Sequence, residues 1–380
     1  MALGYEIRHC SDRKGKGLFA TKDFLENEVI FEEKPLVSCQ FAWNETYGYL
    51  ACHHCMRPME DTEENIRRLT NNPNIVLPFP ELCPVNKSLH RYCDQCGVGF
   101  CSDSCKQQSW AQYHEYLCFG THPVLKNLYE AWKTMHYPPE TASVMLIARM
   151  IAIIEQAQDK DSAISAFLEF AHGTTEERDG SILKFLGEQF FEKFECLRLL
   201  MLDIFQTCHA QSLVTEDGLK TLFAIAGRNS QGIGTSVFSI WVKNVEKFEM
   251  TEERRNEINE FIDNIYLGMD RHVGCFLNNE GSGLYQLERC INHSCLPNAS
   301  STFPYGDFTL ALVAKTPISA GEEICISYLD ECELERSKHS RNKHLREYYL
   351  FECECEKCLK QSDEPDVTSE EETDSDMDEE

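Results

Sequence analysis

The hydrophobic positions along this chain follow two different periods. Near both ends they alternate with polar residues, as in residues 28–32, 308–313 and 323–328, and this period is typical of half-buried strands. In the middle of the chain they recur every three or four residues, which is typical of amphipathic helices. The clearest helical positions are Val144, Ile147, Ile151 and Ile154, followed by Phe185, Phe190, Phe194, Leu197 and Met201.

These patterns divide the chain into broad regions. Strand and turn signals fill residues 1–50, helical patterns fill residues 122–270, and strand patterns return at residues 281–329. Thr251 precedes acidic residues, as a helix N-cap does, and a basic helical stretch covers residues 335–349. The sequence therefore predicts an α+β protein whose strands come from both ends of the chain.

Composition and charge narrow the classes of function. The chain has 380 residues and a mass of 43.8 kDa, which suggests two or three packed units. Its 63 acidic residues outnumber 36 basic ones and give a formal net charge of −27. Direct binding of nucleic acid needs a basic surface and is not expected, whereas an acidic protein suits a basic partner such as a lysine-rich peptide. Residues 361–380 hold acidic but no basic residues and are predicted to be a disordered tail.

Neither a membrane span nor a secretion signal is expected. The longest apolar stretch, residues 142–157, contains Arg149 and Glu155 and is too short to cross a bilayer. The N-terminal residues lack the apolar segment of a signal peptide, so we expect a protein of the cytoplasm and nucleus. In those compartments the 20 cysteines should not form disulfides, and metal binding is the leading explanation for them.

Residues 52–118 contain four pairs of metal-type ligands at short spacing. Two pairs are Cys-x2-Cys, and a knuckle of that length turns both thiolates toward one ion. The other two are Cys-x3-Cys and His-x3-Cys, which suit helical turns because positions i and i+4 share a face. Buried free thiols would not be expected to fall into consecutive pairs, so we predict two zinc sites. The pairs are Cys52 and Cys55, Cys93 and Cys96, Cys101 and Cys105, and His114 and Cys118.

A second cysteine cluster lies near the C-terminus, where Cys353, Cys355 and Cys358 form the pattern Cys-x-Cys-x2-Cys. Three thiolates need a fourth ligand to complete a tetrahedral zinc site, and Cys295 is the candidate from elsewhere in the chain. Such an ion would fasten the C-terminal segment onto the preceding strand region. In the alternative, Cys295 is a core thiol and the other three cysteines bind zinc together with water.

The first cluster resembles the MYND zinc finger. In that family the first ligand pair joins the third, and the second joins the fourth. The resemblance therefore implies one zinc ion on Cys52, Cys55, Cys101 and Cys105, and another on Cys93, Cys96, His114 and Cys118. This chain departs from the family by a long insertion at residues 56–92, with a predicted helix at residues 61–70. Cys83 and His90 lie within the insertion, but the better-spaced ligands already fill both sites.

Several segments taken in order resemble the SET- and MYND-domain family of protein lysine methyltransferases, and most closely its fifth and most divergent branch. They are the Gly-Lys-Gly-Leu-Phe-Ala of residues 15–20, the finger, the Asn-His-Ser-Cys-Leu-Pro-Asn of residues 292–298, the Gly-Glu-Glu of residues 321–323 with Tyr328, and the second cysteine cluster. The resemblance covers residues 10–360. It implies a SET domain of small sheets, in which the Asn-His-Ser segment and the C-terminal strand form a pseudoknot.

The resemblance also implies a division of the chain into domains. A finger and a helical insert split the SET domain, and a post-SET zinc segment follows it. Relatives usually continue with a long helical-repeat domain, whereas only the acidic tail follows Lys360 here, so we expect a more open substrate groove. The predicted boundaries are 1–51 for the SET N-terminal part, 52–118 for the MYND finger with its insertion, 119–270 for the helical insert, 271–335 for the SET catalytic part, 336–360 for the post-SET segment and 361–380 for the tail.

S-adenosylmethionine is the cofactor that the resemblance implies, together with three zinc ions. Tyr328 matches the active-site tyrosine of the family, whose hydroxyl would lie near the transferring methyl group. The matching cofactor contacts are Lys14, Gly15, Lys16, Gly17, Asn229, Asn292, His293, Tyr328, Tyr349 and Phe351. From the residues alone, a packed strand tyrosine, a satisfied core histidine and aromatic core packing are the alternative interpretations.

The implied activity is protein-lysine N-methylation of histone tails or of other basic proteins such as ribosomal proteins. A lysine inside an apolar channel beside a sulfonium ion has its pKa lowered by desolvation and like charge, so no strong base is required. The alternative is a weakly catalytic scaffold whose finger recruits partners as a transcriptional corepressor. The presence of Tyr328, of the Asn-His-Ser-Cys segment and of the C-terminal cysteines favours the enzyme, and we expect it to be a monomer.

Overall fold

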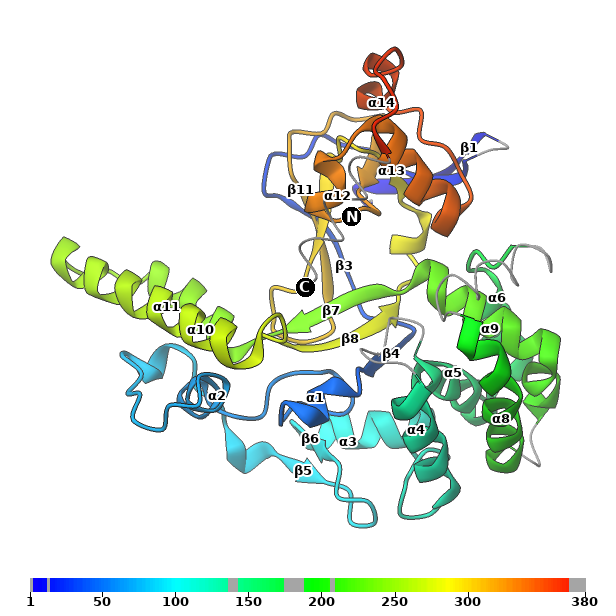
Figure 1. Ribbon diagram of the computed structural model, residues 1–380, viewed down its shortest axis with the longest axis horizontal. Coiled ribbons are helices and arrows are strands. Elements are labelled where there is room, and N and C mark those ends of the chain that lie inside the picture. Colours follow the sequence, from blue (N-terminus) through cyan, green and yellow to red (C-terminus); the bar gives the residue numbers. More distant parts are fainter. Residues whose placement is uncertain (1–2, 12–13, 136–142, 174–187, 206–208, 369–380) are drawn as a thin grey trace. The chain divides into compact units, whose positions relative to one another are not determined.

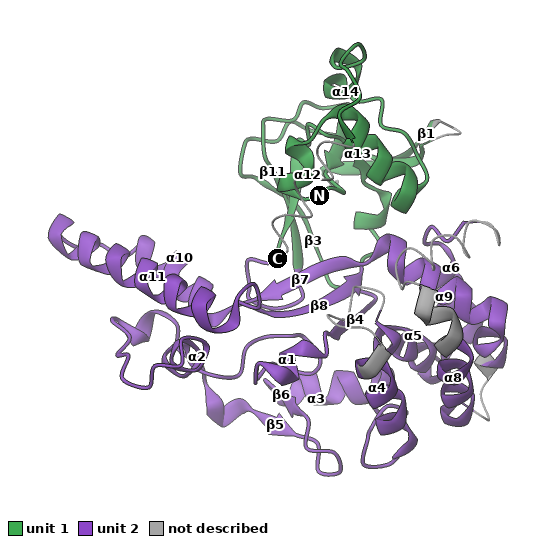
Figure 2. Ribbon diagram, viewed as in Figure 1, with its two compact units in different colours: residues 1–34, 285–302, 310–380 green, residues 35–284, 303–309 purple. Residues whose placement is uncertain are grey.

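The computed structural model describes residues 3–11, 14–135, 143–173, 188–205 and 209–368 (Figure 1). Two compact units make up the chain (Figure 2). Phe185 of a predicted helix lies outside the described residues, and so do residues 369–380 of the predicted tail. Unit 1 combines residues 1–34, 285–302 and 310–380, and unit 2 combines residues 35–284 and 303–309.

Unit 1 contains a sheet with the strand order β1-β2-β12-β9. β1 (Tyr5–Ser11) and β2 (Gly15–Ala20) form an antiparallel hairpin, and β12 (Glu323–Ile326) adds antiparallel to β2. The short strand β9 (Asn292–His293) then pairs in parallel with β12. Leu18 of β2 is fully buried between these strands and their surroundings. The parallel pair places the Asn-His-Ser segment directly beside the end of β12.

A second sheet of unit 1 has the order β10-β11-β3 and is antiparallel throughout. It consists of β3 (Val29–Glu33), β10 (Ala299–Thr302) and β11 (Leu310–Ala314). The alternating patterns at residues 28–32 and 308–313 therefore do form strands, with slightly shifted ends. β11 is almost wholly buried, which explains its nearly continuous apolar sequence.

The basic stretch predicted as helical over residues 335–349 is not one continuous helix. α12 (Glu331–Glu335) ends where Arg336 turns to an extended conformation. α13 (Lys338–His344) begins after Ser337, whose hydroxyl accepts a hydrogen bond from the Ser340 amide. Because this N-cap satisfies a free backbone donor, a new helix starts here (Figure 1). A π-helical turn extends α13 through Tyr349.

The helices of unit 2 pack around two apolar cores. In the larger core, α5 (Val144–Gln156) is buried on nearly every side because α4 (Val124–Met135), α8 (Glu188–Ile204) and α9 (Glu216–Asn229) surround it (Figure 1). The predicted helical positions of α5 are all buried, as are Phe194, Leu197 and Met201 of α8. Within the described residues no helix combines the length and the apolar character needed to cross a membrane.

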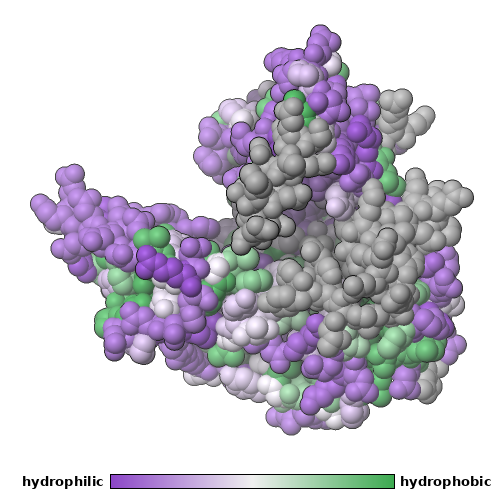
Figure 3. Space-filling model, in the orientation of Figure 1, coloured by the Kyte–Doolittle hydropathy of each residue, from purple (hydrophilic) through white to green (hydrophobic). Residues whose placement is uncertain are grey.

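The smaller core of unit 2 joins α2 (Thr62–Leu69), α10 (Val237–Glu246) and α11 (Glu252–Val273). α2 is the helix predicted in the finger insertion, and a capping box between Asp61 and Glu64 fixes its start. Hydrophilic residues cover most of the α10–α11 pair in the view of Figure 3. The insertion therefore packs into a core that it shares with α10 and α11.

Unit 2 also contains a three-stranded antiparallel sheet with the order β4-β8-β7, in which β4 is Val37–Gln40 and β8 is Asn279–Leu284. β7 (Gln231–Thr235) lies inside the region predicted to be largely helical, and here the prediction was wrong. Its sequence, Gln-Gly-Ile-Gly-Thr, has a single large apolar side chain, so it carries too little alternation to reveal a strand. Glycine is required at position 281 of β8, because a Cβ there would lie 2.2 Å from the Cys39 carbonyl oxygen.

The remaining elements are short. In chain order they are β4 (Val37–Gln40), α1 (Trp43–Thr46), β5 (Arg91–Tyr92), β6 (Gly99–Phe100), α3 (Asp103–Ser109), α6 (Lys160–Leu168), β8 (Asn279–Leu284) and α14 (Glu356–Lys360), with 3-10 turns at Pro80–Leu82, Lys87–Leu89, His209–Val214 and Glu288–Cys290 and a π-helical turn at Trp110–His114.

Candidate active site and metal centres

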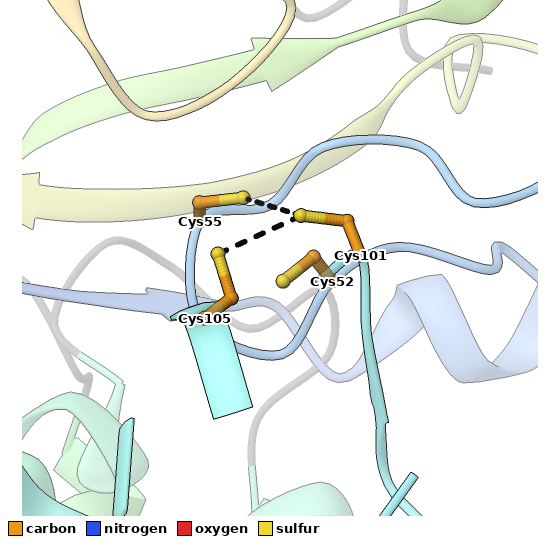
Figure 4. A group of neighbouring side chains, drawn as sticks. All are labelled: Cys52, Cys55, Cys101 and Cys105. Atoms are coloured by element: carbon orange, nitrogen blue, oxygen red, sulfur yellow. Dashed lines mark hydrogen bonds between the residues drawn. The ribbon is translucent and has the colours of Figure 1, made fainter. Parts of the chain in front are cut away.

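The first predicted zinc set gathers in unit 2 from two separated segments (Figure 4). The Sγ atoms of Cys55 and Cys101 are 3.6 Å apart, and those of Cys101 and Cys105 are also 3.6 Å apart. A tetrahedral zinc ion with Zn–S bonds of about 2.3 Å requires neighbouring sulfurs to be about 3.8 Å apart. Cys52 completes the group, so four thiolates fit the coordination shell of one zinc ion.

Local backbone geometry explains how these thiolates converge. The amide of Met56 donates to the carbonyl of Cys52 at 2.9 Å, and Met56 adopts a positive φ of 64°, which closes the Cys-x2-Cys knuckle. Cys101 precedes α3, and Cys105 lies inside it, after Ser102 caps the helix by accepting from the Cys105 amide. The Cys-x3-Cys pair therefore spans a helix start, where the prediction expected a helical turn for both residues.

The second set brings together Cys93, Cys96, His114 and Cys118, the combination that the resemblance to the MYND finger implies. The Sγ atoms of Cys93 and Cys118 are 3.7 Å apart, and Cys96 Sγ lies 3.5 Å from His114 Nε2. Burial, the largest cause, lowers the pKa of His114 to about 4, so its imidazole is neutral, as a metal ligand must be. Among the described residues, Cys83 belongs to neither group and instead donates to the Val237 carbonyl.

The C-terminal set lies in unit 1 and joins two distant segments. Cys295, which follows β9, has its Sγ 3.9 Å from that of Cys353 and 3.6 Å from that of Cys358. Cys355 completes the group at the start of α14. Since Cys295 lies with the other three thiols, water is not needed as a fourth ligand.

Each unit contains a buried arginine, and that of unit 1 contacts the sulfurs of the C-terminal cysteine set. In unit 1 the Arg341 guanidinium donates to Cys295 Sγ at 3.3 Å and to Cys358 Sγ at 3.4 Å, although its side chain is only 1% exposed. In unit 2, Arg149 is 4% exposed and lies over the Tyr113 ring at 4.4 Å. A tetrathiolate zinc site carries two negative charges, and a buried cation next to it compensates for them.

The predicted catalytic tyrosine lies in an aromatic group of unit 1. The ring of Tyr328 is 4.9 Å from that of Tyr349, 6.2 Å from that of Phe351 and 5.4 Å from that of His293. Its hydroxyl donates to the Ile291 carbonyl at 2.6 Å, just before β9. Burial is the largest cause that raises the pKa of Tyr328, so the hydroxyl stays protonated and acts as a hydrogen-bond donor.

His293 links this tyrosine to the C-terminal cysteine set. Its Nδ1 accepts a hydrogen bond from the Tyr328 amide at 3.0 Å, and its Nε2 lies 3.3 Å from Cys295 Sγ. The Tyr349 hydroxyl also donates to the Tyr328 carbonyl at 3.3 Å. The contacts of His293 and Tyr349 fix the backbone of the predicted catalytic residue, so His293 has a positioning contact to Tyr328 in this structure.

The glycine turn and Asn292 meet around a carboxylate that the sequence analysis did not single out. The Asn292 amide donates to Glu323 Oε1 at 2.7 Å and to the Lys16 carbonyl at 3.1 Å, while Lys14 Nζ lies 3.1 Å from Glu323 Oε2. Burial acts to raise the pKa of Glu323, but these donors hold it below its usual value. Glu323 belongs to the Gly-Glu-Glu motif of residues 321–323, and this motif is the sequence signal from which Glu323 could have been identified.

Two glycines of this turn are required for different reasons. Gly15 has a φ of +66°, and a Cβ built on it would meet nothing within 4 Å, so its backbone is open to a ligand. A Cβ on Gly17 would lie 2.4 Å from Cys10 Sγ and 3.0 Å from the Asn292 amide nitrogen. Gly17 is therefore needed for packing against Asn292, and Gly15 for the turn.

Asn229 does not belong to the unit that contains the other predicted cofactor contacts. It is the last residue of α9 in unit 2, where its amide nitrogen donates to the carbonyls of Ala171 and Ile225 at 2.8 Å each. Its carbonyl oxygen accepts from the Ala171 amide at 3.2 Å. These bonds give Asn229 a structural task at the helix end, and its cofactor role stays a prediction.

The residues of unit 1 fit S-adenosylmethionine by their chemistry. Aromatic faces at Tyr328, Tyr349 and Phe351 suit a sulfonium cation and an adenine ring, and the open backbone at Gly15 suits close approach of a ligand. Asn292 supplies an amide beside that turn. The donor sets of the three cysteine groups likewise fit zinc.

Comparison with known proteins matches these observations. The sequence matches the SET domain family over residues 15–329. It is 50% identical over 373 residues to the protein-lysine N-trimethyltransferase SMYD5 of Gallus gallus, covering 97% of this chain and 89% of that protein. The SMYD5 of Homo sapiens is 49% identical over 375 residues, covering 97% and 90%.

Shorter or weaker similarities extend to other methyltransferases. The histone-lysine N-methyltransferase SMYD3 of Mus musculus is 42% identical over 89 residues, covering 23% of this chain and 19% of that protein. The crystal structure of the SET domain of LSMT bound to lysine and AdoHcy covers 92% of this chain and 53% of that one, at 13% identity and a TM-score of 0.33, too low to add to the argument. The extended matches are sufficient: the chain belongs to the SMYD family of SET-domain protein-lysine methyltransferases and is an enzyme of that class.

Proposed function

We propose that this enzyme methylates lysine side chains of basic proteins, histone tails or ribosomal proteins among them, and adds up to three methyl groups. The observation that carries the proposal is the convergence of Tyr328 with Asn292, His293, Tyr349 and Phe351 within unit 1. The trimethyltransferase names of the SMYD5 relatives support the number of methyl groups. The net charge of −27 supports a basic substrate.

S-adenosylmethionine would supply an electrophilic methyl group beside the aromatic residues when bound. The Tyr328 hydroxyl, kept neutral by its raised pKa, orients the lysine nitrogen and cannot compete with it as an anionic nucleophile. Asn292 and the open turn at Gly15 would hold the amino-acid part of the cofactor, and Tyr349 and Phe351 its ring. By family resemblance we also assign Asn229 to the cofactor. We propose the cytoplasm and the nucleus as the compartments of the enzyme, and a monomer as its active form.

We assign structural zinc to the three cysteine groups, with the first two forming a MYND finger and the third a post-SET site. The sulfur separations of 3.6 to 3.9 Å support this assignment. Elemental analysis of the purified protein should find three zinc ions per chain. Two or fewer would contradict the ligand sets.

The activity is tested by incubating a cell lysate with labelled S-adenosylmethionine and either wild-type or Tyr328→Phe protein. We expect the variant to label substrates about 10²–10³-fold more slowly, as when a positioned donor is removed from an active site. Tyr92→Phe is the matched control because Tyr92 is an exposed tyrosine of β5 in unit 2. Equal labelling by wild type and Tyr328→Phe would remove Tyr328 from its role. A corepressor scaffold without activity would show neither labelling nor calorimetric binding of S-adenosylmethionine.

A further inference from the structure

Unit 1 contains a buried carboxylate that no step of the proposed mechanism uses. Glu288 opens the 3-10 turn Glu288–Cys290 and is 7% exposed. Its carboxyl accepts one hydrogen bond, from the Ser301 hydroxyl at 2.7 Å. Within the described part of the chain, no basic side chain forms an ion pair with it. Burying an acid with so little compensation costs folding energy, so this placement suggests a task other than stability.

The turn that carries Glu288 also holds the catalytic tyrosine. The Ile291 amide donates to the Glu288 carbonyl at 2.8 Å, and the Ile291 carbonyl accepts from the Tyr328 hydroxyl at 2.6 Å. The charge of Glu288 is also among the causes that raise the pKa of Tyr328. The backbone of Glu288 and the Tyr328 phenol are therefore linked through Ile291, on the approach to β9, and the Glu288 charge acts on that phenol.

A second acid adds negative charge to the same turn. The Glu33 carboxylate accepts from the Leu287 amide at 2.9 and 3.0 Å and from the Glu288 amide at 3.3 Å. Burial, the largest cause, raises the pKa of Glu288 to about 8, the Ser301 hydroxyl acts against this, and the Glu33 charge adds to it. Arg289 is the cation nearest in sequence, and its charge acts on Glu33. A cation that entered beside Glu288 would relieve both acids.

We propose that Glu288 binds the ammonium group of the substrate lysine next to Tyr328 and takes up its proton before methyl transfer. This inference rests on the proposed function and adds to it a polar group that recognises lysine. A lysine reaches any protein as an ammonium ion, which has no lone pair, so one N–H bond must break before nitrogen can attack. Glu288 supplies both the charge that attracts the ammonium and the base that accepts the proton.

The proton and electron balance of this step is complete. Entry of the ammonium displaces the carboxyl proton of Glu288 to solvent and leaves a carboxylate–ammonium pair. The carboxylate then takes one proton from nitrogen, and the freed lone pair forms the new N–C bond while the S–C bond breaks and sulfur keeps its electron pair. The product leaves as a methylammonium ion, and each later round repeats the same loss of one proton. One turnover therefore releases one proton to solvent.

The test is the pH dependence of kcat/KM for the Glu288→Gln variant, using a synthetic peptide around a lysine that the wild-type protein methylates. Glutamine keeps the volume and still accepts from Ser301, but it cannot bind an ammonium by charge or take its proton. We expect a loss of about 10²-fold at pH 7. The loss should shrink to about threefold near pH 10, where lysine loses its proton unaided. Glu32→Gln, at an exposed position of β3, is the charge-matched control and should keep the wild-type profile.

Three results would overturn the inference. One is a Glu288→Gln rate at pH 7 close to that of wild type. Another is a loss that is the same at every pH, because a purely structural residue would not move the profile. The third is lost binding of S-adenosylmethionine by calorimetry, since that would place the defect at the cofactor. If the wild-type protein itself methylates no lysine, the proposed function fails instead, so the two failures are distinguishable.

Discussion

The buried arginines of the two units differ in what they contact near the proposed zinc sites. Arg341 in unit 1 donates directly to the sulfurs of Cys295 and Cys358. Arg149 in unit 2 donates instead to the backbone carbonyls of Ser38 at 2.6 Å and His53 at 3.1 Å, and His53 lies between two zinc ligands in sequence. In the described residues, neither arginine forms an ion pair with a carboxylate. One arginine touches ligand atoms, and the other holds the backbone that presents them.

The difference lies in how the thiolates are oriented locally, because both units join cysteines that are far apart in sequence, 46 residues for Cys55 and Cys101 and 58 for Cys295 and Cys353. The finger sets come from residues 52–118, and tight turns and a helix cap already aim their thiolates. In the C-terminal set, Cys295 follows the short strand β9 and meets the cysteines of residues 353–358. Direct N–H···S bonds from Arg341, which α13 carries, supply the missing orientation. His293 also connects the C-terminal set to Tyr328, because it contacts both Cys295 and the Tyr328 amide, whereas the finger sets lie in the other unit.

The strongest test of this comparison removes one ligand from each unit. Cys295→Ser should lower the zinc content from three ions to two and abolish methylation, because His293 and the Tyr328 backbone lose their anchor. A structural zinc ion contributes about 10–16 kcal/mol in zinc-finger peptides, so the local fold should not survive its loss. Cys105→Ser should also lose one ion, but should keep more activity. Zinc analysis and labelling of the same samples provide the measurement.

Cys332→Ser is the matched control for the C-terminal segment, because Cys332 is exposed in α12 and belongs to none of the metal groups of the described residues. It should retain three zinc ions and wild-type labelling. Equal activity losses in Cys295→Ser and Cys105→Ser would break the comparison, since both centres would then support catalysis alike.

A smaller effect separates the two arginines themselves. Arg341→Met should weaken zinc binding at the C-terminal set by about 10–100-fold, the usual cost of losing a group that orients metal ligands. Release of one ion to a chromogenic chelator should therefore become faster. Arg149→Met should lower the thermal unfolding temperature, because the Ser38 carbonyl loses its buried donor, but should leave the rate of zinc release from the C-terminal set unchanged. Faster release of that same ion from Arg149→Met would contradict the distinction.

The sequence predicts the metal ligands better than it predicts the groups around them. Ligand spacing is a local property, so pairs such as Cys52 and Cys55 are visible in the sequence, and the structure gathers all twelve predicted ligands into three sets. The amphipathic helix α5 and the strands β3 and β11 are visible for the same reason, because their periodicity reflects burial on one side or on all sides.

Groups whose partners are distant in sequence escaped prediction. Arg341 appeared only as one basic residue in a helical stretch, since nothing local shows that it meets Cys295. Glu288 looked like an ordinary charged residue, and only the fold shows that β10 buries it against Ser301. β7 was missed because its glycines carry no hydrophobic signal, although β8 specifies its register.

The last test concerns buried acids, which have different partners in the two units. Glu60 in unit 2 is 4% exposed, and its carboxylate pairs with Arg68 and accepts from the Asn65 amide. Glu288 in unit 1 is similarly buried, but among the described residues its carboxyl has a hydrogen bond only from the Ser301 hydroxyl. Burial raises the pKa of both acids, and for Glu60 the Arg68 charge opposes the rise. Paired and unpaired buried acids should therefore respond differently to neutralisation.

We expect the stability of Glu288→Gln, relative to that of wild type, to increase as the pH rises. Between the usual carboxyl pKa of 4.5 and about 8, folded wild-type protein holds a proton on Glu288 that the unfolded chain releases. Wild-type stability from this group therefore falls by up to about 1.4 kcal/mol per pH unit across that window, and glutamine does not titrate. Thermal unfolding at pH 5 and pH 8 should show a gap that widens in favour of the variant. Glu60→Gln should instead be less stable than wild type at both values, because it leaves Arg68 without its charge partner. A stability difference between Glu288→Gln and wild type that is the same at pH 5 and pH 8 would mean that a cation or water compensates the Glu288 carboxyl in solution. Glu288 would then resemble the paired Glu60 of unit 2.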